Sequence, residues 1–171
     1  IIATAFELIF EAECRIDSFE ADTRLNDSLK NWVLGLVDPT QVVPFSVYNS
    51  ILNLTALTFD LPQDLIFTRL KEKILNQTWI LHGAFSEPQF KYNAIIYDFF
   101  STKAMTSFWE ESYLQNFFEK ASDDFCAMGT YACTGALKRS LKNNGYQFMK
   151  RKGFSWKKAS SFAFKNKKGV S

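Results

Sequence analysis

The stretch 86-SEPQFKYNAIIYDFF-100 contributes most to the prediction of the fold class. It opens with Ser86, Glu87 and Pro88, and a capping residue followed by an early acid and an early proline is typical of a helix N-terminus. Apolar side chains then recur at spacings that one face of a helix accommodates. The stretch therefore predicts a helix whose apolar residues are Phe90, Tyr92, Ile95, Ile96, Phe99 and Phe100.

Helical signals continue on both sides of this stretch. Downstream, we expect a helix over 104–120 and another over 122–141, the second capped by Ser122 and followed by Gly145. Upstream, apolar periodicity with capping or proline signals predicts four more helices. These cover 3–19, a segment opening at Asn26 or Asp27, a segment after Pro44 and a segment opening at Asp60.

Two segments of the chain also favour extended structure. Residues 79–85 form a short extended piece, and the β-branched residues after Pro44 leave a strand as the alternative there. The abundance of apolar residues, 47 % of the chain, predicts a real core. The fold class expected is all-α: a single globular domain of six to seven helices over residues 1–145, followed by a basic, aromatic-rich C-terminal segment over 146–171.

Charge is strongly segregated along the chain. Residues 1–136 hold 18 acidic and nine basic residues, a net charge of −9, whereas 137–171 hold eleven basic residues and no acid. Such a basic segment attracts anions, including nucleic acid, acidic lipid or an acidic protein. The segregation therefore predicts an acidic helical body that contacts protein partners and a C-terminal segment that binds an anionic partner.

Aromatic residues alternate with the basic clusters of the C-terminal segment. Lys and Arg neutralise phosphates, and exposed aromatic rings stack on unpaired bases at about 1–3 kcal/mol per base. This alternation favours single-stranded nucleic acid, and RNA is the form we expect. The predicted anion-binding residues are Lys138, Arg139, Lys142, Lys150, Arg151, Lys152, Phe154, Trp156, Lys157, Lys158, Lys165, Lys167 and Lys168.

Two alternatives for this segment stay open. The units 153-GFSWKK-158 and 161-SFAFK-165 interleave Lys clusters with Phe and Ser, and in this the segment resembles the effector segment of the myristoylated alanine-rich C-kinase substrates. The resemblance covers about 25 residues and implies binding to anionic lipid or calmodulin, controlled by phosphorylation at Ser155, Ser160 or Ser161. The other alternative is packing of the aromatic residues on the acidic body or on a neighbouring subunit.

Motifs for enzymatic chemistry are scarce in this sequence. His82 is the only histidine, which excludes a histidine pair and an H-E-x-x-H site. Cys14, Cys126 and Cys133 form no C-x-x-C pair, and no G-x-G-x-x-G, Walker loop or nucleophile elbow occurs. We therefore expect no metal and no cofactor. Carboxylate-only sites leave no motif, so the sequence favours a non-enzymatic protein and leaves activity open.

These observations lead to one functional expectation with two alternatives. We expect a non-enzymatic, helical binding or assembly protein that holds single-stranded nucleic acid through its C-terminal segment. The alternatives are a membrane-surface or calmodulin-responsive protein and a structural subunit of a larger complex. Three cysteines at low density favour a reducing, intracellular compartment.

Overall fold

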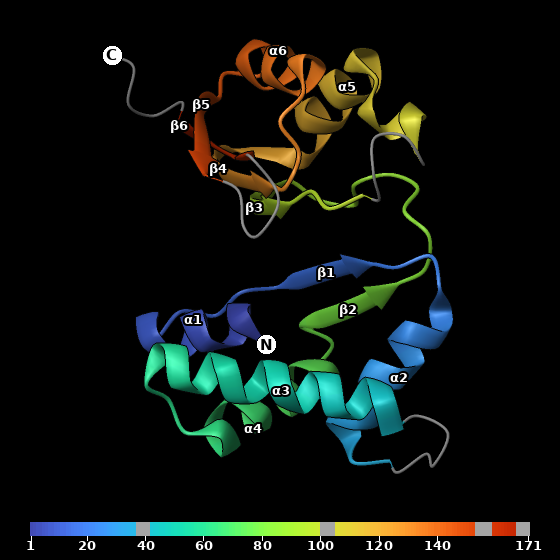
Figure 1. Cartoon of the computed structure of the whole chain (residues 1–171), viewed down its shortest axis with the longest axis vertical. Helices are drawn as coiled ribbons and strands as arrows, with labels where there is room; N and C mark the ends of the chain where they lie inside the picture. The colour runs from blue at the N-terminus through green and yellow to red at the C-terminus, as the bar shows by residue number, and fades with distance from the viewer. Residues whose placement is uncertain (37–41, 100–104, 153–158, 167–171) are drawn as a thin grey trace. The chain divides into compact units, whose positions relative to one another are not determined.

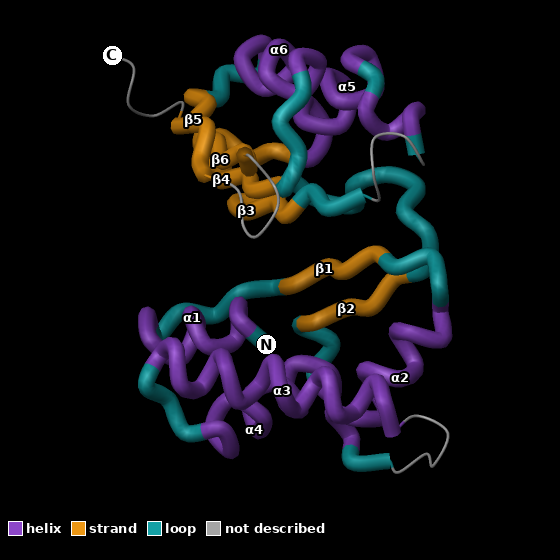
Figure 2. The backbone as a smooth tube through the Cα atoms, in the orientation of Figure 1, coloured by secondary structure: helices purple, strands orange, loops and turns teal. Residues whose placement is uncertain are grey.

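The computed structural model describes residues 1–36, 42–99, 105–152 and 159–166. The chain forms two compact units, Ile1–Ser86 and Glu87–Ser171, each with helices and strands (Figure 1, Figure 2). None of the described helices combines the length and apolarity needed to cross a membrane.

The first unit is mainly helical and contains one pair of strands. Its elements are α1 (Ile2–Phe10), β1 (Ile16–Phe19), α2 (Thr23–Leu34), α3 (Val42–Phe59), α4 (Gln63–Leu75) and β2 (Trp79–His82). Asp22 caps α2 by accepting a hydrogen bond from the Arg24 N–H, and Gly35 ends that helix at a φ of 71°, where glycine is favoured. Helices α1 to α4 enclose a core formed by Ala5, Trp32, Val33, Leu52, Ala56, Ile66 and Leu70.

The second unit is a mixed sheet covered by helices. Its elements are β3 (Tyr92–Ile96), η2 (Thr106–Trp109), α5 (Glu111–Ala121), β4 (Ser122–Thr130), α6 (Gly135–Asn143), β5 (Gln147–Lys152) and β6 (Ala159–Asn166). The strand order is β3-β4-β6-β5, in which β3 and β4 are parallel and β6 is antiparallel to both of its neighbours. Helices α5 and α6 pack together beside this sheet (Figure 1).

The predicted all-α fold is wrong, and the stretch 86–100 shows why. It contains β3, in which Ile95 is 8 % exposed and the next residue, Ile96, is 88 % exposed, while Tyr97 is buried again. This alternation is the period of a strand, whereas the helix prediction counted both isoleucines on one apolar face. A short apolar run is compatible with the period of a helix and with the period of a strand. The capping signal at Ser86 favoured the helix, which was incorrect.

The helix predicted over 122–141 is also wrong, because the segment is divided between a strand and a shorter helix. In β4 the side chains of Cys126, Met128 and Thr130 are buried at every second position. Helix α6 begins only at Gly135, where the Thr134 side chain accepts a hydrogen bond from the Leu137 N–H. The Gly129 between the two buried residues would have weakened a helix and is compatible with a strand in this sheet.

Other sequence predictions have mixed outcomes. The helices expected after Pro44 and after Asp60 are confirmed as α3 and α4. The helix expected to open at Asn26 or Asp27 is present as α2, but its predicted start is wrong, because α2 begins at Thr23 with Asp22 as its cap. The extended piece expected over 79–85 is confirmed for Trp79–His82, which forms β2. The helix expected over 3–19 is wrong beyond Phe10, because Glu11 adopts a left-handed conformation with a φ of 49° and β1 follows. The C-terminal segment supplies β5 and β6, so its described part is strand.

Candidate functional site

The parallel strands of the first unit place one set of candidate functional residues. β1 and β2 run in the same direction, with Phe19 opposite His82, so both strands end at one edge. In open α/β structures, ligands bind beyond the carboxyl ends of parallel strands. Here that edge consists of Phe19 and His82 with the residues that follow them, Glu20 and Gly83.

His82 is held at this edge by defined contacts. Its Nε2 lies 2.7 Å from Asp17 Oδ1, its ring stacks on Phe19 with centroids 4.6 Å apart, and its carbonyl accepts a hydrogen bond of 2.7 Å from Asn26. Burial acts to raise the pKa of Asp17, but hydrogen bonds and charge from His82 and Arg15 outweigh burial and lower it. The ionised carboxylate therefore fixes the orientation of the imidazole.

Glu20 is the acidic residue that directly follows β1. Its backbone N–H donates to the His82 carbonyl over 3.3 Å, and its Oε1 accepts a hydrogen bond of 2.8 Å from the Asp22 N–H. The half-buried carboxylate is thus tied to the turn between β1 and α2. An acid after a parallel strand is suited to accept hydrogen bonds from the hydroxyl groups of a ribose.

The second unit repeats this arrangement at the ends of β3 and β4. Tyr97 and Asp98 follow β3, and Tyr131 follows β4. The Tyr97 hydroxyl donates to the Phe108 carbonyl over 2.6 Å, and the Tyr131 hydroxyl donates to the Phe99 carbonyl. The first bond joins the end of β3 to η2, and the second joins the end of β4 to the residues that follow β3.

Asp98 carries the exposed carboxylate of this second edge. Burial and the nearby charge of Asp98 raise the pKa of Tyr131, and burial raises the pKa of Tyr97 above its ordinary range. Both tyrosines therefore stay neutral hydrogen-bond donors, and the exposed Asp98 carboxylate is suited to face a cation.

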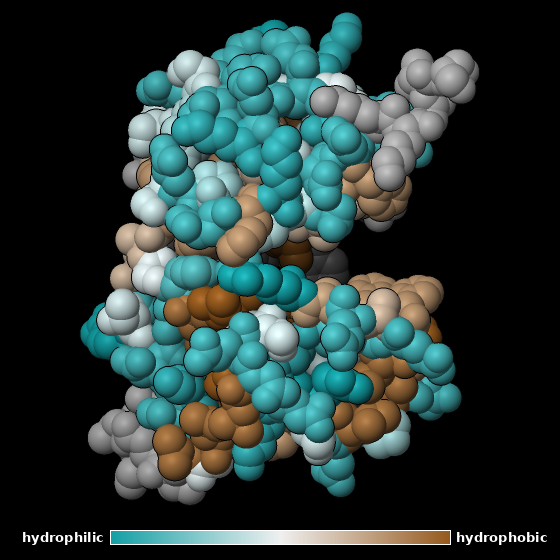
Figure 3. All heavy atoms as spheres, turned by 180° about the vertical axis from the view of Figure 1, so that it is seen from behind, coloured by the Kyte–Doolittle hydropathy of each residue, from teal (hydrophilic) through white to brown (hydrophobic). Residues whose placement is uncertain are grey.

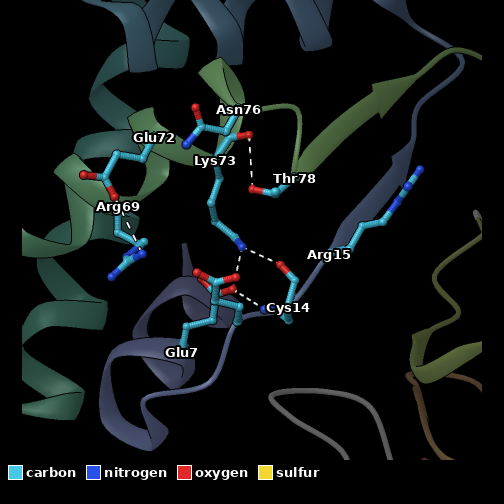
Figure 4. Close-up of a pocket in the computed structure, with 9 residues that line it drawn as sticks. Glu7, Cys14, Arg15, Arg69, Glu72, Lys73, Asn76 and Thr78 are labelled. Carbon is cyan, nitrogen blue, oxygen red and sulfur yellow. Dashed lines mark hydrogen bonds and ion pairs between the residues drawn. The ribbon is translucent and has the colours of Figure 1, made fainter.

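A separate pocket of about 320 Å³ lies in the first unit (Figure 4). Lys73 Nζ donates 2.5 Å hydrogen bonds to Glu7 Oε1 and to the Cys14 carbonyl, and the Cys14 N–H donates to the same Glu7 oxygen. Burial acts to raise the pKa of Glu7, but these bonds outweigh it and lower the pKa. The ion pair joins α1, α4 and the segment before β1, which is a structural role.

Cys14 beside this pair is unsuited to nucleophilic chemistry. Although Cys14 is exposed as a residue, partial desolvation of its thiol and the adjacent Glu7 raise its pKa to about 11, so the thiol stays protonated. Within the described ranges, no three His, Cys, Asp or Glu side chains lie together as a candidate metal site.

Three of the predicted anion-binding residues lie on α6. Lys138, Arg139 and Lys142 are exposed there. Arg139 forms an ion pair of 2.7 Å with Glu111, and Lys138 Nζ lies 5.4 Å from the centre of the Phe148 ring on β5.

The other predicted anion-binding residues lie on β5, on β6 or outside the described residues. Lys150, Arg151 and Lys152 belong to β5, and Lys150 is exposed. Lys165 on β6 is 5 % exposed, with its Nζ 5.8 Å from the centre of the Tyr146 ring, so it lies inside the unit. The other predicted residues, Phe154, Trp156, Lys157, Lys158, Lys167 and Lys168, lie outside the described residues.

The sequence prediction missed the residues at the strand ends. Glu20 and Asp98 each follow a short apolar segment, but both segments were predicted to be helical and so had no carboxyl edge. The pairing of His82 was not apparent from the sequence, because its partner Asp17 is 65 residues away in the chain. Recognition of 15-RIDSFE-20 as a strand followed by an acid would have provided the missing signal.

Comparison with known families now identifies the class of protein. The model of a family described as S-adenosyl-L-methionine-dependent methyltransferase matches residues 55–166, which is more than half of the chain. The chain therefore belongs to this family. No curated protein matches it.

The family corrects the functional expectation drawn from the sequence. Methyltransferases are enzymes with α/β folds, so the expectation of a non-enzymatic, all-helical binding or assembly protein is wrong, as are its membrane-surface and structural-subunit alternatives. The earlier expectation was based on the charge of the C-terminal segment. That charge gives no information about the chemistry of residues at the strand ends.

The residues at the strand ends fit part of S-adenosyl-L-methionine. In the first unit, the Glu20 carboxylate suits the ribose hydroxyl groups, and the stacked rings of Phe19 and His82 suit an aromatic base. A Cβ added at Gly83 would meet no atom within 4 Å, so the backbone there is approachable. The sequence 1–171 contains no G-x-G-x-x-G to provide the glycine-rich turn of many nucleotide sites.

Proposed function

We propose that this protein is an enzyme that transfers a methyl group from S-adenosyl-L-methionine to an acceptor. The observation that carries the proposal is the family match over 55–166, a range that includes β2, β3 and β4. The acidic residues at the carboxyl ends of parallel strands support it, because this is where α/β enzymes bind nucleotides.

The strand-end residues of the first unit have defined roles in this proposal. Glu20 binds the ribose hydroxyl groups, and the Asp17–His82 pair keeps the edge beside Glu20 in a fixed conformation. When bound, S-adenosyl-L-methionine supplies an electrophilic methyl carbon: the acceptor's lone pair forms the new bond, the carbon–sulfur bond breaks, and its electron pair stays on sulfur.

Binding of S-adenosylhomocysteine to the full chain tests this proposal. Glu20→Gln is expected to weaken binding about 10- to 100-fold, because hydrogen bonds to a charged group contribute about 1.5–3 kcal/mol. Isothermal titration calorimetry measures the affinity. The matched control is Glu13→Gln, an exposed acid before the other end of β1, which should leave the affinity unchanged. Equal affinities for both variants, or no binding by the wild type, would refute the role of Glu20.

We also propose that the methyl acceptor is an anionic polymer, with single-stranded nucleic acid favoured. The support is the charge of +11 over 137–171 and the exposure of Lys138 and Lys142 on α6 and Lys150 on β5. A contact between the acidic first part of the chain and a protein partner stays a separate proposal.

The double variant Lys138→Ala/Lys150→Ala tests the anionic acceptor. Each lost phosphate contact should reduce the slope of log affinity against log salt by about 0.7 for a single strand. Fluorescence anisotropy of a labelled oligonucleotide at several salt concentrations measures that slope. Lys71→Ala, an exposed lysine of the first unit, is the control. A slope that is the same in all three proteins, or binding to anionic vesicles in place of the oligonucleotide, argues against the proposal.

A further inference from the structure

The end of helix α6 carries an asparagine that is followed directly by a glycine. Asn144 and Gly145 form the only such dipeptide in the sequence 1–171. This dipeptide is chemically labile, because glycine has no side chain to shield its own peptide nitrogen. That nitrogen can attack the side-chain carbonyl carbon of the asparagine, Cγ. Asn144 is half-buried and Gly145 is exposed, so the fold decides whether the two groups can react.

The amide group of Asn144 is anchored between the two helices of the second unit. Its Nδ2 donates a hydrogen bond of 3.1 Å to the Gln115 carbonyl on α5 and one of 3.0 Å to the Ser140 carbonyl on α6. Both donors of the amide are therefore used, and the side chain joins α5 to α6. Because Nδ2 is the atom that would leave in the reaction, its release requires both bonds to break.

The attacking nitrogen is also held by the fold. The Gly145 N–H donates a hydrogen bond of 3.0 Å to the Lys142 carbonyl, and the Tyr146 N–H donates one of 2.9 Å to the Leu141 carbonyl. These bonds close the end of α6, with Gly145 in the left-handed region at a φ of 81°. The nitrogen attacks only after it has lost its proton. A hydrogen-bonded N–H therefore stays unreactive until the helix end opens.

We propose that Asn144 is a latent modification site, which is unreactive while α5 and α6 are packed together and is deamidated when they separate. This property goes beyond methyl transfer and does not depend on it. In the opened state, the Gly145 nitrogen gives its proton to solvent and bonds to Asn144 Cγ. The bond from Cγ to Nδ2 breaks, and ammonia leaves.

Water completes the reaction. It adds to one of the two carbonyls of the five-membered ring that has formed, and the ring opens to aspartate or isoaspartate without any oxidant or reductant. Figure 3 shows mainly hydrophilic side chains on one face of the second unit, so this unit is in contact with the water that the reaction consumes.

The modified residue cannot restore the closed helix pair. An ionised carboxylate has no N–H, so at position 144 it would face the carbonyls of Gln115 and Ser140 as acceptor against acceptor. Its negative charge would also lie at the C-terminal end of α6, where the helix dipole disfavours anions. Deamidation is therefore irreversible for the fold, and modified chains should accumulate in proportion to the time that the second unit spends open.

Peptide mapping by mass spectrometry of the full chain, incubated at mildly alkaline pH, tests the proposal. A synthetic peptide covering 141–148 gives the rate without protection by the fold. The full chain in buffer should deamidate Asn144 more than about tenfold more slowly than the peptide, and in concentrated urea at the rate of the peptide. Asn116 on α5 is the internal reference, because it is exposed but precedes the bulky Phe117 and should react slowly in both conditions.

Loosening the contact between the helices should raise the rate in the folded chain. The buried Ser140 hydroxyl donates a hydrogen bond of 3.1 Å to the Glu111 carbonyl at the start of α5. Ser140→Ala should therefore increase deamidation of Asn144 in buffer about two- to tenfold, the effect expected for loss of one such bond. Ser112→Ala, at an exposed position of α5, is the matched control and should leave the rate unchanged. Circular dichroism shows whether each variant keeps its fold.

The consequence of deamidation is tested with Asn144→Asp. This variant should increase hydrogen exchange in peptides from α6 more than about tenfold, because the carboxylate is held against two carbonyls. Asn143→Asp adds the same charge at the exposed neighbouring position and should exchange close to the wild-type rate.

Four results would overturn the proposal. Equal rates in the folded chain and the peptide would show that the fold gives no protection, and an unmodified Asn144 in urea would show that the site is not labile. Equal rates in the two serine variants would mean that separation of α5 from α6 does not control the reaction. Equal exchange in the two aspartate variants would mean that the modified residue does not disturb the helix pair.

Discussion

Replacing Lys73 by Met is expected to lower the free energy of unfolding of the first unit by about 3–5 kcal/mol. The side chains of Lys73 and Glu7 are 5 % and 7 % exposed, and they are joined over 2.5 Å. Without the ammonium group, the Glu7 carboxylate would remain buried with its charge no longer paired, while the Cys14 N–H would still donate to it. Urea unfolding, followed by hydrogen exchange in peptides from residues 1–86, measures the loss in this unit.

An exposed ion pair on the same helix provides the control for Lys73. Arg69 and Glu72 lie 3.7 Å apart and are 43 % and 52 % exposed, so Arg69→Met should cost at most about 1 kcal/mol. The double variant Glu7→Gln/Lys73→Met should recover much of the stability, because it removes the charge together with its partner. If Lys73→Met costs no more than Arg69→Met, the buried pair does not hold α1 against α4.

The pH dependence of unfolding distinguishes loss of charge pairing from loss of packing. Because the folded state lowers the pKa of Glu7, the ionised form stabilises folding above the ordinary glutamate pKa of about 4.3. That contribution disappears as the pH falls from there through the folded-state pKa. The wild type should therefore lose more stability on acidification than Glu7→Gln/Lys73→Met, and parallel curves would indicate packing alone.

The helices of the first unit could be predicted because their signals are local. Asp60 and Pro62 precede α4, and Gly35 follows α2, so capping and proline geometry mark the ends without tertiary contacts. The strands β3 and β4 depend on pairing between residues such as Ile95 and Met128, which lie far apart in the chain. Their short apolar runs fit a helix equally well until that pairing is known.

The residues of the candidate site could not be predicted for the same reason, because their positions depend on contacts that are distant in the chain. Glu20 and Asp98 acquire their significance only as residues after parallel strands, and the direction of a strand is not encoded in its own sequence. Lys165 shows the converse error: its charge suggested a surface position, yet strand β6 places it opposite Cys126 inside the unit. Charge counts along the chain therefore located the basic segment but could not separate surface lysines from buried ones.

Phe118→Ala is expected to destabilise the second unit by about 3–5 kcal/mol. Phe118 on α5 is fully buried, and its ring lies 5.2 Å from Phe117, 5.7 Å from Tyr146 and 6.0 Å from Tyr97. Truncation would remove contacts between α5 and the residues that flank β3 and β5, and it would leave a cavity. Hydrogen exchange in peptides from 105–152 during urea unfolding measures the effect.

Phe125 on β4 supplies the matched control for Phe118, because the same substitution there removes a ring that is 59 % exposed. Phe125→Ala should change the stability by at most about 1 kcal/mol, since little of the ring leaves water on folding. Phe118→Leu should fall between the two alanine variants, because it keeps part of the buried volume. Equal costs for the two alanine variants would mean that the ring of Phe118 does not join α5 to the sheet, and that the packing of the second unit rests on other side chains.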